Sequence, residues 1–401
     1  MRHGAFPQAS AGLAAGVAAL LVFTAACGSG NSPTTNNSLS DSKSSALLAK
    51  VASKVTADKA IPTWAAPGLQ VDVSKLKGKR VFIIPEAANP FNENIQNTYK
   101  QLFNAVGVKW MFYANQGLIS QWIAGMDTAI AQRPDLIILS AAPDPRVLQP
   151  QLRAARAAGI PIEVTQFYDR SAPPPPVCLA CAAGVTALVT GPYNNGGAAE
   201  ADWIINDSHG RAHVLIVMAP DVIPSPGILS AMEREYRTYC PGCTYKVIDV
   251  PVAQWSTGLQ SQVQSALLAD SSVNYVDAEG DGMCTGAVPA VQAVGKTGSV
   301  KVVSFNGSPF ALDDIRTSSI IAMDASENTR WIGFADVDQA FRLLAGMSPV
   351  NETIPFRVMD KSNVTQAGVP ATNYLGYGNS YAVGFWHLWG LPGSPPSPPL
   401  S

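Results

Sequence analysis

The sequence carries little charge and no catalytic signature. Only 14% of its 401 residues are charged, and the net charge is −2, so nothing favours nucleic acid or an anionic membrane surface as a partner. The histidines beyond residue 3 are His209, His213 and His387, and none lies in an H-E-x-x-H or Ser-His-Asp context. G-x-S-x-G and G-x-x-x-x-G-K-[ST] motifs are absent, and no G-x-G-x-x-G follows the first predicted strand. We therefore expect neither an enzyme nor a bound cofactor or metal.

No run is long and apolar enough for a transmembrane helix, but the N-terminus has the pattern of an export signal. A basic start precedes an apolar run at residues 11–23 that is too short to span a bilayer, and small residues then lead to Cys27. This pattern is similar to a bacterial lipobox and predicts a signal peptide over residues 1–27, with Cys27 lipidated. Because Thr24 stands where leucine is usual, an ordinary cleaved signal is the alternative. Residues 28–78 are expected to be a tether and lead-in.

The few cysteines fit an exported chain. Beyond Cys27 they form two C-x-x-C steps, Cys178 with Cys181 and Cys240 with Cys243, and Cys284 is isolated. Exported thiols are usually oxidised, so two local disulfides are predicted. Free or cross-paired thiols and a zinc site remain the alternatives. Cys284 is expected to be a buried thiol.

From residue 80 onward, short apolar runs alternate with helical patterns. The first run ends at Pro85, and a small-residue turn leads to a helix with Asn89 as its cap and Pro90 at its first position. Strands are expected at residues 80–85, 109–113, 136–139, 162–165, 187–190, 213–218, 245–250, 273–278, 300–305 and 320–323. Such alternation predicts two successive doubly wound parallel sheets, an α/β fold. Ligands bind at the carboxyl edge of such sheets.

Several motifs together resemble the ribose-type (type I) periplasmic sugar-binding proteins of bacterial ABC transporters. They are Asn89-Pro90-Phe91, residues 136–140 with 154–162, Asp281-Gly282-Met283 through Ala287, Ser304-Phe305-Asn306-Gly307, residues 333–346 and residues 381–390. Those late segments resemble actinobacterial members. The order and spacing of these motifs, over roughly residues 80–390, carry the resemblance.

The resemblance implies two lobes joined by a three-crossover hinge. One lobe would hold residues 79–190 plus about 325–350, the other residues 191–324 plus about 351–390, and residues 391–401 would be a disordered tail. It further implies an extracytoplasmic lipoprotein on the outer face of the cell membrane, which closes on a sugar or polyol and delivers it to an ABC permease. A ligand sensor of the same fold, signalling to a membrane partner, is the alternative.

A sugar site needs flat apolar surfaces and fixed polar groups. Phe91 and Trp255 are the predicted stacking surfaces. The predicted polar contacts, at strand ends and crossovers, are Asn89, Asn92, Gln166, Glu279, Asp281, Asn306, Asp324 and Glu327. For each of these, a helix cap, a core position or a solvated loop is the alternative reading.

One departure from the family pattern concerns the second lobe. Where the family has an arginine, this chain has an apolar and Pro-Gly stretch at residues 224–228, so a bidentate clamp on adjacent hydroxyls is missing. Asn306 and Gln166 also replace aspartates of the family. We therefore expect a more neutral and more apolar site than a ribose pocket.

Overall fold

The computed structural model describes residues 35–141, 143–169, 184–318 and 320–398. Residues 44–401 form one compact unit. Cys27, Cys178, Cys181 and the predicted signal peptide lie outside the described residues. Among those that are described, no helix is both long and apolar enough to cross a bilayer.

The first sheet is entirely parallel, in the order β11-β5-β4-β3-β1-β2. Its strands are β1 (Arg80–Pro85), β2 (Lys109–Phe112), β3 (Leu136–Ser140), β4 (Ile162–Asp169), β5 (Ala187–Gly191) and β11 (Glu352–Thr353). In β1, Val81 and Ile83 face one core and Phe82 and Ile84 face another. Helices thus cover both faces, as an unbroken apolar run requires.

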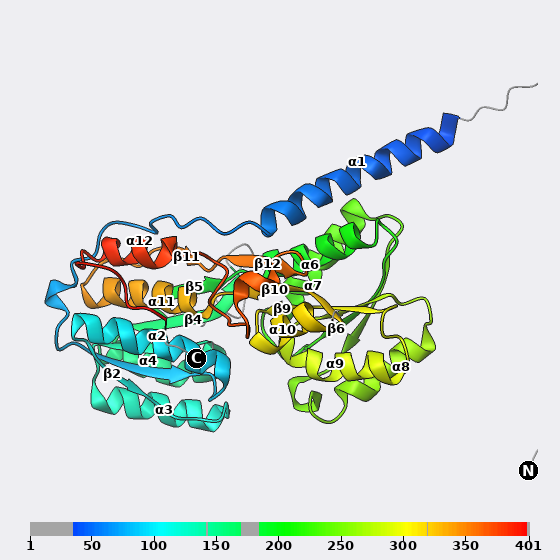
Figure 1. The fold of residues 1–401 in the computed structure, drawn as a ribbon. Coiled ribbons are helices and arrows are strands. Elements are labelled where there is room, and N and C mark those ends of the chain that lie inside the picture. The colour runs from blue at the N-terminus through cyan, green and yellow to red at the C-terminus, as the bar shows by residue number, and fades with distance from the viewer. Residues whose placement is uncertain (1–34, 142, 170–183, 319, 399–401) are drawn as a thin grey trace, which may run out of the picture. The chain divides into compact units, whose positions relative to one another are not determined.

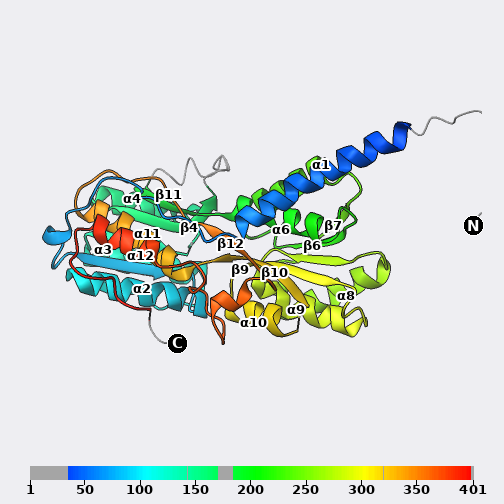
Figure 2. The ribbon, with the colours of Figure 1, turned by 45° about the horizontal axis from the view of Figure 1, so that its top comes forward.

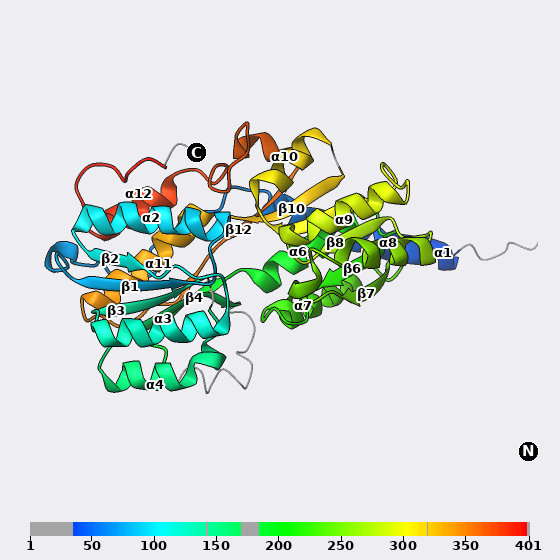
Figure 3. The same ribbon diagram turned by 90° about the horizontal axis from the view of Figure 1, so that it is seen from below.

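Figure 3 shows this layering, with α2 (Pro90–Val106) on one face of the sheet and α3 (Ile119–Gln132) and α4 (Gln149–Ala157) on the other. The helix α11 (Thr329–Leu344) packs beside α2, and α12 (Ser380–Leu388) packs on α11. A short 3-10 turn, η2 (Pro145–Leu148), precedes α4.

The second sheet has the order β12-β10-β9-β8-β6-β7 and is parallel except where β12 pairs antiparallel with β10. Its strands are β6 (His213–Met218), β7 (Thr244–Asp249), β8 (Tyr275–Ala278), β9 (Lys301–Asn306), β10 (Ile321–Glu327) and β12 (Phe356–Asp360). Its helices are α6 (Tyr193–Asp207), α7 (Ser225–Tyr239), α8 (Leu259–Ala269), α9 (Asp281–Ala293) and α10 (Pro309–Thr317). Figure 1 shows the two sheets with their separate sets of helices. The expected fold class, two doubly wound α/β lobes, is confirmed.

The chain passes between the sheets more often than expected. It crosses between β5 and α6, between β10 and α11, and between β11 and β12, and then returns to the first set of helices at α12. Residues 352–353 therefore belong to the first sheet and α12 to its helices, although both were expected in the second lobe. Residues 352–353 are held by pairing with Val189 and Thr190 of β5. For α12 the reason is the indole of Trp389, which is 1% exposed and donates to Asp338 on α11 at 2.7 Å.

Both ends of the described chain are more ordered than a tether and a tail would be. A helix, α1 (Thr35–Asp58), begins where a tether was expected, and its residues Val51 and Val55 join the core of α6 and α7. Near the other end, the Pro396 carbonyl accepts a hydrogen bond from Arg330 and the Ser397 carbonyl one from Gln101. Figure 2 shows α1 in blue beside α6.

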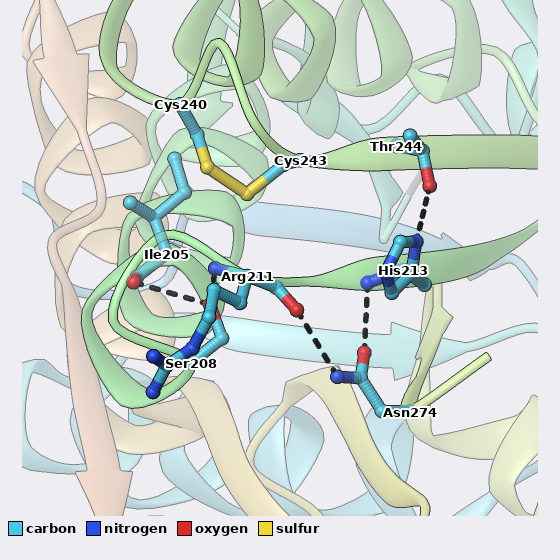
Figure 4. The surroundings of a disulfide bond; sticks show 8 residues. All are labelled: Ile205, Ser208, Arg211, His213, Cys240, Cys243, Thr244 and Asn274. Carbon is cyan, nitrogen blue, oxygen red and sulfur yellow. Dashed lines mark hydrogen bonds between the residues drawn. A yellow bond between two sulfur atoms is a disulfide. The ribbon is translucent and has the colours of Figure 1, made fainter. Parts of the chain in front are cut away.

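Cys240 and Cys243 form a disulfide with a Cα–Cα distance of 5.3 Å, just before β7 (Figure 4). Around it, Asn274 accepts from the His213 amide at 2.7 Å and donates to the Arg211 carbonyl at 3.2 Å. Cys284 is a buried free thiol, and burial raises its pKa well above the ordinary value. In the described part of the chain, no three His, Cys, Asp or Glu side chains are placed to hold a metal ion.

Candidate functional site

A cavity of about 100 Å³ lies at the carboxyl edge of the second sheet. It is lined by Tyr193, Val222, Pro224, Ile228, Trp255, Glu279, Gly280, Phe305 and Asn306. Three of the predicted site residues, Trp255, Glu279 and Asn306, are thus brought together. Trp255 and Glu279 lie in the loops that follow β7 and β8, and Asn306 is the last residue of β9. All three are thus at the carboxyl edge of one sheet, which is where ligands bind in open α/β folds.

The Trp255 side chain is held in place by a hydrogen bond and by contact with α9. It ends the short turn η3 (Val252–Gln254), and its indole N–H donates to the Val250 carbonyl at 3.1 Å. The ring lies against Gly282 at the start of α9, where an added Cβ would come within 2.8 Å of it. A flat apolar surface held in this way can pack against the C–H face of a ring-shaped ligand.

Glu279 supplies the carboxylate of the cavity. Its oxygens accept hydrogen bonds from the Ala219 amide at 2.5 Å and from the Ser225 hydroxyl. Burial raises its pKa from 4.5 to about 7, although these two donors act in the opposite direction. The group therefore carries its proton part of the time near neutral pH and can either accept or donate a hydrogen bond.

Asn306 lies next to Glu279 along the sheet, at the end of β9. Its backbone is left-handed, with φ of 121°, a conformation that asparagine tolerates better than most residues. The side-chain amide donates to Glu327 at 3.4 Å. Glu327 is 1% exposed, and burial raises its pKa to about 8. Glu327 thus accepts a hydrogen bond from Asn306 but does not itself line the cavity.

Asp281 and Asp324 lie in the interior, although both were predicted to contact ligand. They share the Ser304 hydroxyl, at 2.6 Å and 3.2 Å respectively, and Asp281 also accepts from the Ser308 amide at 2.6 Å. Their exposed fractions are 1% and 0%. Through the Ser304 hydroxyl the two carboxyls link β9, β10 and α9, and neither is among the lining residues of the cavity.

The predicted residues of the first lobe form a turn of their own. Asn89 caps α2 by accepting from the Asn92 amide at 2.8 Å, and the Asn92 side chain donates to the Ala87 carbonyl at 2.8 Å. The side-chain oxygen of Asn92, Oδ1, is buried and has no hydrogen-bond partner among the described residues. Phe91 packs half-buried against the core. None of the three lines the cavity.

Gln166 is connected to the cavity through Tyr193. Gln166 has φ of 56° and is 5% exposed, and its carbonyl accepts from the Tyr193 hydroxyl at 2.9 Å. Both side chains lie against Gly191, where an added Cβ would be 2.5 Å from Tyr193 and 3.1 Å from the Gln166 oxygen. Neither Oε1 nor Nε2 of Gln166 has a partner in the described part of the chain. A buried amide without partners is costly unless a ligand or water satisfies it.

The sequence interpretation missed the aromatic wall made by Tyr193 and Phe305. Their ring centroids are 5.8 Å apart, and Gly196 leaves room for Phe305, since an added Cβ would lie 2.4 Å from that ring. The signal was present: Phe305 directly precedes Asn306 in the quoted motif, and Tyr193 follows the first crossover. The apolar stretch at residues 224–228 was noted, and it does form one wall of the cavity.

Two larger hollows involve the terminal segments. One, of about 420 Å³, is lined by the 374–381 loop and residues 395–398, and the other, of about 470 Å³, by residues 63–67 and the 351–355 crossover. Neither contains a predicted site residue, so the 100 Å³ cavity is the better candidate.

The comparisons with known proteins agree with this fold. The profile of the family described as "Periplasmic binding protein domain" matches residues 80–348. No curated protein matches the chain.

Several solved structures share the fold. An ABC transporter solute-binding protein from Agrobacterium vitis, bound with α-D-tagatopyranose, is 22% identical to this chain, with a TM-score of 0.64. The match covers 74% of this chain and 99% of the Agrobacterium vitis protein. One from Bacillus halodurans with myo-inositol has 17% identity and a TM-score of 0.64, with coverages of 74% and 99%. One from Mycobacterium smegmatis with glycerol has 17% identity and a TM-score of 0.63, with coverages of 75% and 99%.

The family match extends over more than half of the chain, and the two parallel sheets and the cavity at a strand edge agree with it. This is a family of binding proteins and not of enzymes, which agrees with the lack of catalytic motifs. The chain belongs to the periplasmic binding protein family, in its type I, two-lobed form.

Proposed function

We propose that the protein is an extracytoplasmic solute-binding lipoprotein that captures a sugar or polyol and delivers it to an ABC permease. The observation that carries the proposal is the composition of the cavity: a fixed indole and two further aromatic rings around Glu279 and Asn306. Rings that cover C–H faces and a few placed polar groups that bind hydroxyls are what a small polyhydroxylated ligand requires.

Two unpartnered polar groups on the first lobe support the proposal. The Gln166 amide and the Asn92 oxygen are buried and lack partners among the described residues. Ligand hydroxyls would satisfy such groups when the hinge closes. The structural neighbours named above bind a ketose, a cyclitol and glycerol, so this fold accommodates ligands of this class.

The lipid anchor and the permease partner are also part of the proposal. The anchor rests on the export signal and on Cys27. Substitution Cys27→Ser is expected to move the protein from the membrane fraction to the medium of a lipoprotein-processing host, and unchanged membrane retention would contradict the anchor. The alternative of a signalling lipoprotein has no observation in its favour among the described residues, and we do not propose it.

Ligand binding is tested by calorimetric titration and thermal shift of the purified mature chain with a panel of sugars and polyols. We expect at least one ligand to bind and to raise the melting temperature, and Trp255→Ala to abolish both effects because it removes the stacking surface. Trp110→Ala is the matched control, since Trp110 lies on β2 of the other sheet and donates to Asn104. A panel without any binding would contradict the proposed function.

A further inference from the structure

The segment that runs from the end of β6 through the first turn of α7 forms a purely aliphatic wall of the cavity. Val222, Pro224 and Ile228 line it, and no polar side chain of that segment does. Ser225 lies within the segment, but it is 3% exposed, and its hydroxyl bonds to the Ala219 carbonyl at 2.7 Å and to Glu279. A ligand group that meets this wall finds no hydrogen-bonding side chain.

The polar and apolar lining groups are separated along the sheet edge. Across the order β7-β6-β8-β9, the cavity meets Trp255 after β7, the aliphatic wall after β6, Glu279 after β8 and Asn306 at the end of β9. Glu279 and Asn306, the hydrogen-bonding residues at this sheet edge, are therefore neighbours on one side, and the hydroxyl of Tyr193 on α6 donates to the Gln166 carbonyl. A ligand that matches this lining is polar where it faces the ends of β8 and β9, and apolar where it meets the aliphatic wall of Val222, Pro224 and Ile228.

The charge of the cavity lining further restricts which classes of ligand can bind. Among the residues that the structure describes, no lysine, arginine or histidine lines it, and the carboxyl that does is that of Glu279. A ligand carboxylate or phosphate would meet that group without a compensating cation. Uronic acids and sugar phosphates are accordingly disfavoured.

We infer that the ligand is a neutral deoxy sugar, whose methyl group lies against Val222, Pro224 and Ile228 where a common hexose has a hydroxymethyl group. This inference rests on the proposed sugar-binding function and names the ligand class of the same site. A hydroxyl placed against this wall would find no side-chain partner there, whereas a methyl group gains apolar contact.

The test compares sugars that differ only at this group: L-rhamnose with L-mannose, L-fucose with L-galactose, and quinovose with D-glucose. Titration calorimetry on the mature chain is expected to show that, in at least one pair, the deoxy member binds about tenfold tighter or more. Val222→Thr keeps the shape of the side chain and adds a hydroxyl to the wall, so it is expected to reduce that ratio several-fold. Val369→Thr, at a residue that is 68% exposed and outside the cavity, is expected to leave the ratio unchanged.

The outcomes separate the two proposals. If hydroxymethyl sugars bind as tightly as their deoxy partners or tighter, the deoxy-sugar inference is wrong and sugar binding itself stands. The inference is equally wrong if other sugars or polyols bind and no pair member does. If no carbohydrate of either panel binds, the proposed function fails and the inference fails with it.

Discussion

At the scale of the residue, Glu279 joins the site to the stability of the fold. The unfolded chain releases the proton of this carboxyl near pH 4.5, whereas burial in the folded chain holds it to about pH 7. Its contribution to stability is therefore complete below pH 4.5 and is lost as the pH rises to about 7. Glu279→Gln removes this loss, so between pH 4.5 and pH 8 the unfolding free energy of the parent should fall relative to the variant, by up to about 3 kcal/mol.

Urea unfolding at several pH values measures this difference. Glu93→Gln, on the exposed first turn of α2, is the control and should track the parent at every pH. If unfolding free energy changes with pH in the same way in the parent and in Glu279→Gln, burial does not raise the pKa of the Glu279 carboxyl.

Single residues also show how far the site was predictable. Trp255, Glu279 and Asn306 could be proposed because each follows a strand that the apolar pattern predicts, and the strand order then brings them to one cavity. Asp281 and Asp324 follow predicted strands in the same way, but Asp281 begins α9, Asp324 lies in the middle of β10, and both carboxyls accept from the buried Ser304 hydroxyl. A side-chain direction set by a partner 20 or more positions away leaves no trace in local spacing.

At the scale of the element, Lys54 links α1 to α6 and α7 through ion pairs, beside the apolar contacts of Val51 and Val55. Lys54 lies 2.5 Å from both Asp202 on α6 and Glu235 on α7, and these carboxylates are 1% and 8% exposed. Lys54→Ala removes the counter-charge of the buried Asp202 and the nearer of the two basic groups beside Glu235, whose other basic neighbour is Arg234 at 3.5 Å. We therefore expect a loss of about 1–3 kcal/mol in unfolding free energy. The Lys54 side chain is itself 37% exposed, and solvent screening keeps the loss below that of a fully buried pair.

Lys50→Ala is the matched control, because Lys50 lies one turn earlier on the same helix and is exposed. Chemical unfolding of both variants decides the point. Equal effects of the two substitutions would mean that the contacts of Lys54 contribute nothing specific.

The elements themselves followed from sequence to different degrees. Buried parallel strands such as β1 and β3 stand out as short apolar runs. The two-residue strand β11 has no such pattern, and only its pairing with Val189 and Thr190 of β5 defines it. Likewise, nothing local in α12 shows which lobe it joins; the stacking of Trp389 on Phe334, with centroids 5.7 Å apart, decides that.

At the scale of the whole molecule, both sheets bury carboxyls that lack full compensation. In the first, Glu163 is 0% exposed, and burial together with the charges of Asp336 and Asp338 raises its pKa well above the ordinary value. Burial raises the pKa of Asp336 to about 8. In the second, Asp277 is also 0% exposed, and burial raises its pKa to about 8.

These shifts all have one sign, so they predict how the stability of the molecule depends on pH. Each carboxyl keeps its proton in the fold and loses it in the unfolded chain near pH 4, so stability is greatest in mild acid and falls as the pH approaches 8. Carboxyls with lowered pKa, such as Asp135 and Asp360, act in the opposite direction only below about pH 4. We expect the melting temperature to fall by about 5 °C or more between pH 5 and pH 8.5.

Calorimetric melting at constant ionic strength measures this fall. Glu163→Gln removes a carboxyl whose two oxygens have no hydrogen-bond partner among the described residues, so it should flatten the curve without costing a contact. Glu93→Gln should leave the slope unchanged. A melting temperature that stays level or rises between pH 5 and pH 8.5 would mean that water or bound cations compensate these carboxylates inside the fold.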